Sequence, residues 1–195
     1  MTATKSAAAV FLVVMMSDTV ALVNNDLAVD LNRAFPELVR QMQDGIYSGV
    51  RRLVPSSADA EDITQETFVR VYRALSDYPA DRIRELNLSG WVWTIALNLS
   101  RNAARTRSRR PRTVELDRDA FFAGPGPEAE AITADQNRQW SRRLGGLPAA
   151  QRDAVVLRHV VGLPYADIAA ATGRAEGTVK ADVHRGIAKL REELS

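Results

Sequence analysis

The sequence lacks cysteine altogether, and it has only two histidines, His159 and His184. The absence of cysteine excludes disulfides, thiolate metal sites and thiol nucleophiles, and it suits a reducing compartment such as the cytoplasm. Two histidines so far apart in sequence make a weak case for a metal, so we expect no catalytic residue, no metal and no cofactor. A strong net charge is also missing, because the formal value is only +2. Any affinity for nucleic acid must therefore come from where the charges lie.

Long apolar runs are absent except for "AAAVFLVVMM" at residues 7–16, which follows Lys5. This run resembles the apolar core of a signal peptide. It is shorter than the roughly 20 residues that span a bilayer, and Asp18 interrupts it. The other interpretation is that the natural start is Met15 or Met16. We expect residues 1–25 to be an N-terminal extension outside the fold.

The rest of the chain is predicted to be helical, because it shows no sustained period-two alternation and its Gly and Pro residues fall mainly between periodic segments. One helical block spans about 26–110, with breaks at 54–59 and 75–90, and a second spans about 130–194. Three of the eight prolines lie between the blocks, in "RPRTVELDRDAFFAGPGPEAEA" at 110–131. We therefore expect an all-α chain of two small helical domains joined by a flexible linker at 113–135.

The C-terminal block contains a helix-turn-helix pattern. Pro164 suits the first turn of a helix, and Ala169, Gly173 and Val179 provide a small residue, a turn glycine and a buried branched residue. Four apolar residues then recur every three or four positions and would face inward: Val179, Val183, Ile187 and Leu190. The residues left outside suit phosphates and groove edges: Lys180, His184, Arg185 and Lys189. The alternative is an ordinary helical hairpin with a solvated basic face.

The segment "GWVWTIALNLSRNAARTRSRRPR" at 90–112 combines two tryptophans with six arginines and no acid. At about 100° per residue, the predicted core stripe comprises Trp91, Val92, Ile95, Ala96, Leu99 and Ala103. Trp93 lies at the edge of this stripe, either as a rim residue that covers the core or as a platform for an unpaired base. Stacking of a base on an aromatic ring contributes ~1–3 kcal/mol. A phosphate backbone would relieve the repulsion among the arginines, which could otherwise be merely solvated.

The segment "DAEDITQETFVRVYRAL" at 59–75 predicts a helix capped by Asp59. Its buried stripe would comprise Ile63, Phe68, Val71 and Leu75. The opposite face would present Asp62, Gln65, Glu66 and Val69. An ordinary solvated face explains this segment taken alone. The carboxylates are not a catalytic pair, because no histidine, second acidic cluster or phosphate loop converges on them.

Taken in order, these two segments and "LPAAQRDAVVLRHVVGLPYADIAAATGRAEGTVKADVHRGIAKLRE" resemble the extracytoplasmic-function (ECF) class of bacterial sigma factors. The resemblance implies two helical domains, region 2 (26–112) and region 4 (136–195), which bind core RNA polymerase and read the −10 and −35 promoter elements. It also implies a cytoplasmic, non-enzymatic protein that is held inactive by an anti-sigma factor. The polymerase contacts would lie on the β′ clamp helices and the β flap.

The resemblance also assigns roles to individual residues. Docking on the clamp helices would use Asp62, Gln65, Glu66 and Val69. Binding and melting of the −10 element would use the loop 78–89 with Trp93, Asn98, Arg101, Arg105, Arg107, Arg109 and Arg110. Contacts with the −35 element would come from Arg174, Thr178, Lys180, His184 and Arg185. Two positions depart from the family pattern, because Ala175 stands where serine is common and Asp182 where arginine is frequent. An acid at 182 would repel phosphate unless it accepts a hydrogen bond from cytosine.

Two other functions fit parts of the sequence. A helix-turn-helix repressor or activator would bind DNA without polymerase, but it normally needs a dimerisation surface, and the N-terminal block shows no heptad seam. A nuclease would need a metal cluster or a nucleophile with its base, and no plausible set of residues supplies one.

Overall fold

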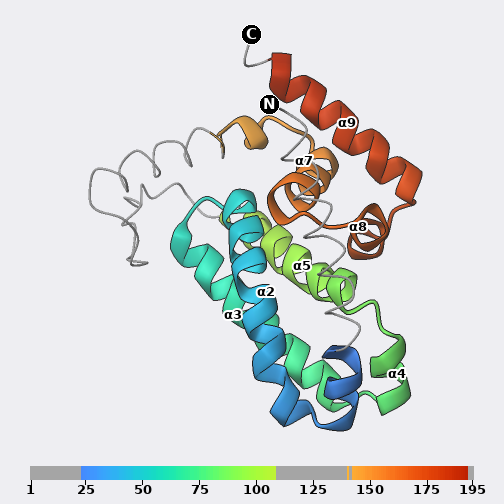
Figure 1. The fold of residues 1–195 in the computed structure, drawn as a ribbon. Helices are drawn as coiled ribbons and strands as arrows, with labels where there is room; N and C mark the ends of the chain where they lie inside the picture. The colour runs from blue at the N-terminus through green and yellow to red at the C-terminus, as the bar shows by residue number, and fades with distance from the viewer. Residues whose placement is uncertain (1–22, 109–139, 141, 193–195) are drawn as a thin grey trace, which may run out of the picture.

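The computed structural model describes residues 23–108, 140 and 142–192, and all regular structure within these ranges is helical. The N-terminal unit (residues 23–108) contains a helix at 23–29, then α2 (Leu31–Leu53), α3 (Ser57–Ser76), α4 (Ala80–Glu85) and α5 (Leu88–Ser108). The C-terminal unit (residues 142–192) contains α7 (Ala149–Val156), η1 (Leu157–Val161), α8 (Tyr165–Thr172) and α9 (Glu176–Glu192). The predicted all-α fold is confirmed (Figure 1). The linker at 113–135 lies outside the described residues.

Short polar side chains set the starts of the first long helices. The Asp30 carboxylate accepts a hydrogen bond from the backbone N–H of Arg33 at 3.1 Å and so caps α2. The Ser56 hydroxyl accepts from the N–H of Asp59 at 3.1 Å and caps α3. The prediction that Asp59 is the cap is therefore wrong. Asp59 lies inside the first turn, where its charge still favours the helix dipole.

The N-terminal unit begins earlier than expected. Val23 and Leu27 on the helix at 23–29 are 5% and 1% exposed, and they join the apolar core. The side-chain amide of Asn24 donates to the carbonyl of Leu86 at 2.8 Å, which ties this helix to the segment after α4. The expected boundary at residue 26 is thus too late, since residues 23–25 belong to the fold. Residues 1–22 lie outside the described part.

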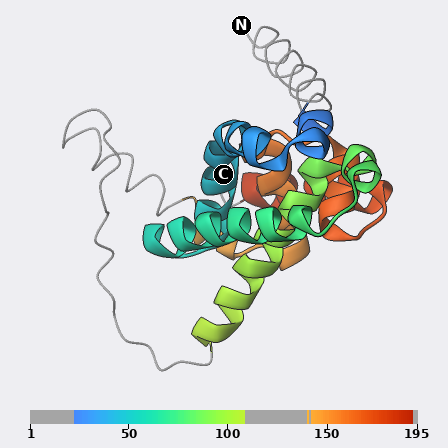
Figure 2. The same ribbon diagram turned by 90° about the horizontal axis from the view of Figure 1, so that it is seen from below.

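The two units pack against each other along α5, and we call this contact the seam. Helix α5 lies between α2 and α3 on one side and α8 on the other (Figures 1 and 2). One apolar cluster runs across it, from Leu38 and Val92 in the N-terminal unit to Leu157 and Ile168 in the C-terminal unit. The expected helical domains are present, and the structure adds that they share a core.

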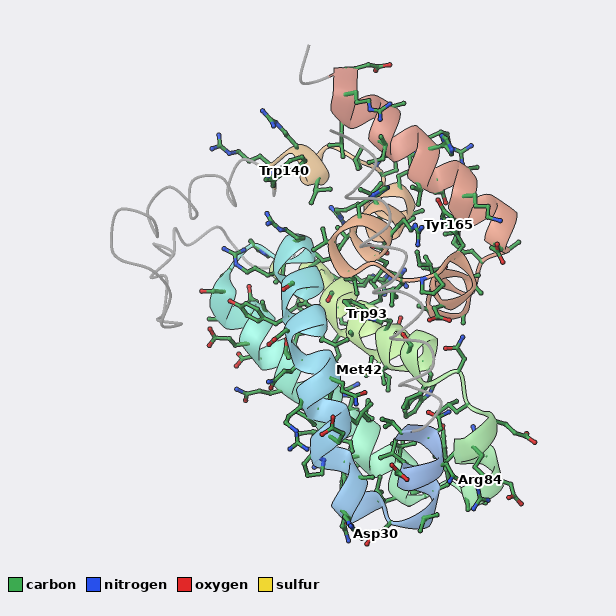
Figure 3. The ribbon with its side chains drawn as sticks, in the orientation of Figure 1. Asp30, Met42, Arg84, Trp93, Trp140 and Tyr165 are labelled. Carbon is green, nitrogen blue, oxygen red and sulfur yellow. The ribbon has the colours of Figure 1, made fainter. Side chains whose placement is uncertain are left out.

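Trp93 lies inside this shared core and is 1% exposed, so the expected position at the edge of the core is wrong (Figure 3). Its indole packs against α2 at Gly49, where a Cβ would lie 2.4 Å from Trp93 Cη2 and 2.8 Å from Val161 Cγ2. A glycine is needed at this position because a ring from α5 and a side chain from η1 both approach the α2 backbone. In this arrangement Trp93 cannot stack on a base.

Candidate nucleic-acid interface

The helix-turn-helix is formed by α8 and α9. Gly173 ends α8 with φ of 66°, the left-handed conformation that glycine adopts without strain. Pro164 occupies the N-cap position just before α8 rather than the first turn, and it makes no side-chain capping hydrogen bond. Val179, Val183 and Leu190 are at most 5% exposed, and Ile187 packs against the core, so the predicted inward face of α9 is confirmed. The helix is thereby held with one face toward solvent.

The outward face of α9 carries the polar and basic side chains expected there. Thr178, Lys180, His184 and Arg185 are all exposed. Lys180 Nζ contacts Glu176 Oε1 at 2.6 Å and lies 5.4 Å from the ring centroid of Tyr165, on α8. Helix α9 lies on the outer side of the molecule, across α5 from α3 (Figure 1). We call the surface made by Thr178, Lys180, His184 and Arg185 the cationic face, and it is accessible.

Asp182 points inward rather than toward the expected phosphates. It is 3% exposed, because positions 179, 182, 183, 186 and 190 form the buried face of α9. Its carboxylate accepts hydrogen bonds from Arg174 Nη1 and, at 2.8 Å, from Arg185 Nη2. The sequence analysis expected this acid to repel phosphate unless it accepts a hydrogen bond from cytosine, and in the structure its carboxylate is occupied by these two arginines. The structure joins it instead to two of the residues assigned to the −35 element.

The arginines of α5 do have an acidic neighbour, which comes from the other unit. Arg101 Nη2 lies 2.7 Å from Asp153 Oδ2 on α7, and the two side chains are 38% and 5% exposed. Asn98 and Arg105 are exposed. The side chain of Arg107, and all of Arg109 and Arg110, lie outside the described residues. An open cavity of about 470 Å³ borders the ion pair and is lined by arginines from both units: Arg101, Arg105, Arg152 and Arg174.

The segment 78–89, expected to form a base pocket, contains α4 and Tyr78, whose ring pairs with Trp91 on α5. Tyr78 and Trp91 are both half-buried, with ring centroids 5.8 Å apart. The Arg82 guanidinium lies 3.7 Å from the centroid of the Tyr78 ring. Trp91, rather than Trp93, is therefore the more accessible tryptophan of α5. The helical projection missed this because it assumed a single buried face.

The C-terminal unit contacts the start of α5 directly. The side-chain amide of Asn87 donates to Asp167 Oδ1 on α8 at 2.9 Å. A Cβ at Gly90 would lie 2.9 Å from Ala170 Cβ and 3.0 Å from the carbonyl oxygen of Asp167. Glycine at position 90 thus permits the close approach of α8. The segment expected to hold a −10 base is partly covered in this arrangement.

The acidic face of α3 is accessible. Asp62 and Gln65 are exposed, and the side chain of Val69 is an exposed apolar residue among them, at 41%. Glu66 forms an ion pair with Arg70, with 2.7 Å between Oε1 and Nε. We call the surface made by Asp62, Gln65, Glu66 and Val69 the acidic face. It presents carboxylates around an apolar centre, which suits a protein partner.

The described residues contain no group of three or more His, Asp or Glu side chains placed to hold a metal ion. None of their helices combines the length and the hydropathy required to cross a membrane.

Comparison with known proteins places both units in one family. The family model for sigma-70 region 2 matches residues 38–110, and that for sigma-70 region 4 matches residues 137–190. The chain is 37% identical over 164 residues to the ECF RNA polymerase sigma factor SigE of Mycolicibacterium smegmatis, covering 83% of this chain and 62% of that protein. It is 32% identical over 162 residues to the ECF RNA polymerase sigma-E factor of Salmonella typhimurium, covering 78% of this chain and 82% of that protein.

Solved structures share the fold. CnrH in complex with the cytosolic domain of CnrY aligns with a TM-score of 0.69 at 24% identity, covering 89% of this chain and 96% of that one. The sigma factor RpoE of Bartonella quintana, in complex with the anti-sigma factor NepR, aligns with a TM-score of 0.61 at 23% identity, covering 82% and 96%. The two matched regions, in order and on one helical fold, show that this chain belongs to the ECF subfamily of the sigma-70 family of RNA polymerase sigma factors.

Proposed function

We propose that this chain is a promoter-specificity subunit, which binds core RNA polymerase, recognises the −10 and −35 promoter elements and promotes melting of the DNA. The observation that carries the proposal is the presence of two accessible and chemically opposite surfaces on one sigma-family chain. These are the acidic face of α3 and the cationic face of α9. The function is binding rather than catalysis.

The acidic face is proposed to dock on the clamp helices of the polymerase β′ subunit. Its carboxylates would speed and orient the encounter with a basic partner, and Val69 would supply apolar contact area at the centre. Tyr72, 37% exposed and hydrogen-bonded through its hydroxyl to Asn32 Oδ1 at 2.6 Å, extends this surface with a fixed aromatic ring. The β flap is the proposed partner of the C-terminal unit.

The C-terminal unit is proposed to place α9 in the major groove of the −35 element. A recognition helix reads base edges with its N-terminal residues and grips phosphates from its flanks. Thr178 and Lys180 occupy the first turns, and His184 and Arg185 follow on the same exposed side. Arg174, in the turn before α9, completes the proposed set.

The N-terminal unit is proposed to hold the −10 element along α4 and α5. Extruding a base costs a few kcal/mol, so cationic and aromatic contacts must offset it. Asn98, Arg101 and Arg105, with the arginines at 107, 109 and 110, would supply backbone contacts. For stacking we now propose Trp91 and Tyr78, because they are half-buried whereas Trp93 is enclosed.

Reading both elements requires the seam to open. The element names imply centres roughly 25 base pairs apart, or about 85 Å at ~3.4 Å per base pair. A compact chain of this length has a radius of gyration of about 16 Å. The 23 residues of the 113–135 segment could span about 80 Å if extended. Opening would also release Arg101 from Asp153 and uncover Asn87 and Gly90.

We further infer a regulatory protein partner, because two solved structures with this fold hold a sigma factor bound to CnrY or to an anti-sigma factor. Such a partner could act by holding the two units together. Because the proposed function requires binding to core RNA polymerase, we propose that the chain acts in the cytoplasm.

The decisive experiment is gel filtration with core polymerase, followed by run-off transcription over a promoter library. The double variant Asp62→Lys and Glu66→Lys should lose co-elution while keeping its helical circular dichroism. A matched control, Asp26→Lys with Asp44→Lys, changes the charge equally at exposed positions outside α3. A regulator that acts without polymerase would instead shift promoter DNA unaided and would never co-elute with the core enzyme.

A further inference from the structure

We propose that Asp182 is a positioning residue for promoter reading, which fixes the guanidinium of Arg185 so that it selects a guanine in the −35 element. The inference rests on the proposed function and concerns how α9 achieves selectivity. Asp182 lies in the second turn of α9 with its side chain 4% exposed, so its carboxylate is part of the interior. The side chain of Arg185, which this carboxylate contacts, extends toward solvent.

The geometry separates a buried anchor from an exposed reader. Arg185 Nη2 lies 2.8 Å from Asp182 Oδ1, yet the Arg185 side chain is 60% exposed. A guanidinium has five N–H donors, and a carboxylate that engages one nitrogen leaves donors on the other nitrogens. Those donors can bind O6 and N7 of guanine in the bidentate mode. Asp182 therefore restricts the side chain without consuming its capacity to read a base.

A second arginine strengthens the anchor. Arg174 Nη1 contacts the other carboxylate oxygen of Asp182, and the Arg174 side chain is 32% exposed. Two cations around one buried carboxylate leave a net positive charge at the surface, so the acid does not abolish attraction to DNA. They also link the turn before α9 to its third turn. The position of α9 relative to the turn before it therefore helps to fix the orientation of Arg185.

The physical advantage of the anchor is preorganisation. A free surface arginine loses rotamer freedom when it binds, and that loss weakens correct and incorrect contacts alike. When Asp182 holds the guanidinium in advance, the side chain cannot swing to a neighbouring phosphate when the base is wrong. The charge of Asp182 lowers affinity for DNA in general, while the fixed geometry raises the penalty for a mismatch. Selectivity and non-specific affinity should therefore move in opposite directions when Asp182 is neutralised.

The test uses the full chain with core polymerase on promoters in which each −35 base pair is changed in turn. A bidentate arginine–guanine contact discriminates by roughly five- to 150-fold, so Asp182→Asn, which releases Arg185 without removing it, should lose a measurable part of that discrimination at one base pair. Its affinity for unrelated duplex should stay the same or rise. Arg185→Lys, which keeps the charge but loses the forked donors, should lose discrimination at the same base pair. The double variant should add little, since both changes remove one contact.

The matched control is Asp81→Asn, which neutralises a carboxylate paired with an arginine outside α9 and away from the seam. It should leave discrimination at every −35 position unchanged. The inference is overturned if Asp182→Asn keeps full discrimination, or if it weakens all −35 positions equally, as loss of helix packing would. If Asp182→Asn does not fold, Arg185→Lys decides, and full discrimination by that exposed variant overturns the inference. Wild-type protein without any −35 dependence would overturn the proposed function itself.

Discussion

Neutralising Asp153 should open the seam between the two units. In the closed arrangement Arg101 donates from Nη2 and Nε to Asp153 Oδ2 at 2.7 and 3.3 Å. Asp153→Asn removes the charge from α7 but keeps a side chain of the same size, so each unit should fold as before. When the seam is open, both side chains would be free to contact water, and the substitution should matter little there. Asp153→Asn should therefore destabilise the closed arrangement and leave the stability of the open one unchanged.

The size of the effect follows from the exposure of the pair. A hydrogen bond to a charged group contributes about 1.5–3 kcal/mol in mutational series. Asp153 is 5% exposed, but Arg101 is 38% exposed, so water screens the interaction. We therefore take a net contribution of about 1–1.5 kcal/mol, which corresponds to a shift of roughly five- to tenfold in the ratio of open to closed molecules.

The natural chain contains no cysteine, so two can be introduced for dye labelling without background. Gln43→Cys on α2 and Ala188→Cys on α9 place dyes at exposed positions on the two units. Single-molecule energy transfer should show one high-transfer population in the parent protein and a larger low-transfer population in Asp153→Asn. Added salt should reduce the difference between the two proteins, because it screens the parent's ion pair.

The control variant is Asp81→Asn, which breaks the exposed Arg84–Asp81 pair within the N-terminal unit. It should leave the energy transfer unchanged. The reasoning is refuted if Asp153→Asn and the control give the same distribution as the parent at low salt. It is also refuted if Asp153→Asn raises the fraction of closed molecules.

Four further substitutions probe other contacts. Gly90→Ala should also raise the low-transfer population, because the added methyl group would meet α8 at 2.9 Å even though alanine favours helix by about 1 kcal/mol; an unchanged distribution would refute the close approach. Gly49→Ala should lower the free energy of unfolding by about 1–3 kcal/mol through a clash with Trp93, and Trp93→Ala by about 3–5 kcal/mol through a cavity, both measured in urea. A nearly neutral Trp93→Ala that nevertheless impaired promoter melting would return Trp93 to the DNA interface. Partial desolvation, and then the adjacent Arg158, lower the pKa of His159, although its side chain remains exposed to solvent. The unfolded chain therefore binds the proton more readily, and stability should fall as the pH drops below about 6.5. His159→Gln should flatten that part of the profile.

Local signals were sufficient for much of the C-terminal unit. The spacing of Gly173 and Val179 predicts a turn and a buried helix face because both requirements act within a few residues. The prediction of helix capping failed at Asp59 for a local reason, since Ser56 lies three residues earlier and its hydroxyl reaches the same turn. The acidic face of α3 was equally predictable from the sequence, because that helix buries a single apolar stripe.

Helix α5 shows what periodicity alone cannot give. A projection of its sequence finds one apolar stripe, but α5 packs against neighbours on two sides, so Trp93 and Leu97 are buried as well. Periodicity reports that a helix has a buried face, and it does not report how many neighbours the helix has. Of the two tryptophans on α5, Trp91 is therefore more accessible than Trp93.

By itself, the sequence determined the helices, their order, the glycine turn and the two oppositely charged surfaces, because each depends on residues within one or two turns of each other. Only the tertiary structure decided the ion pairs that join separate elements. Asp153 lies 52 residues from Arg101, and Asp182 on α9 contacts Arg174 in the turn before that helix. Charge pairing depends on distance in space, and that distance is set by how α7, α8 and α9 pack against the rest of the chain.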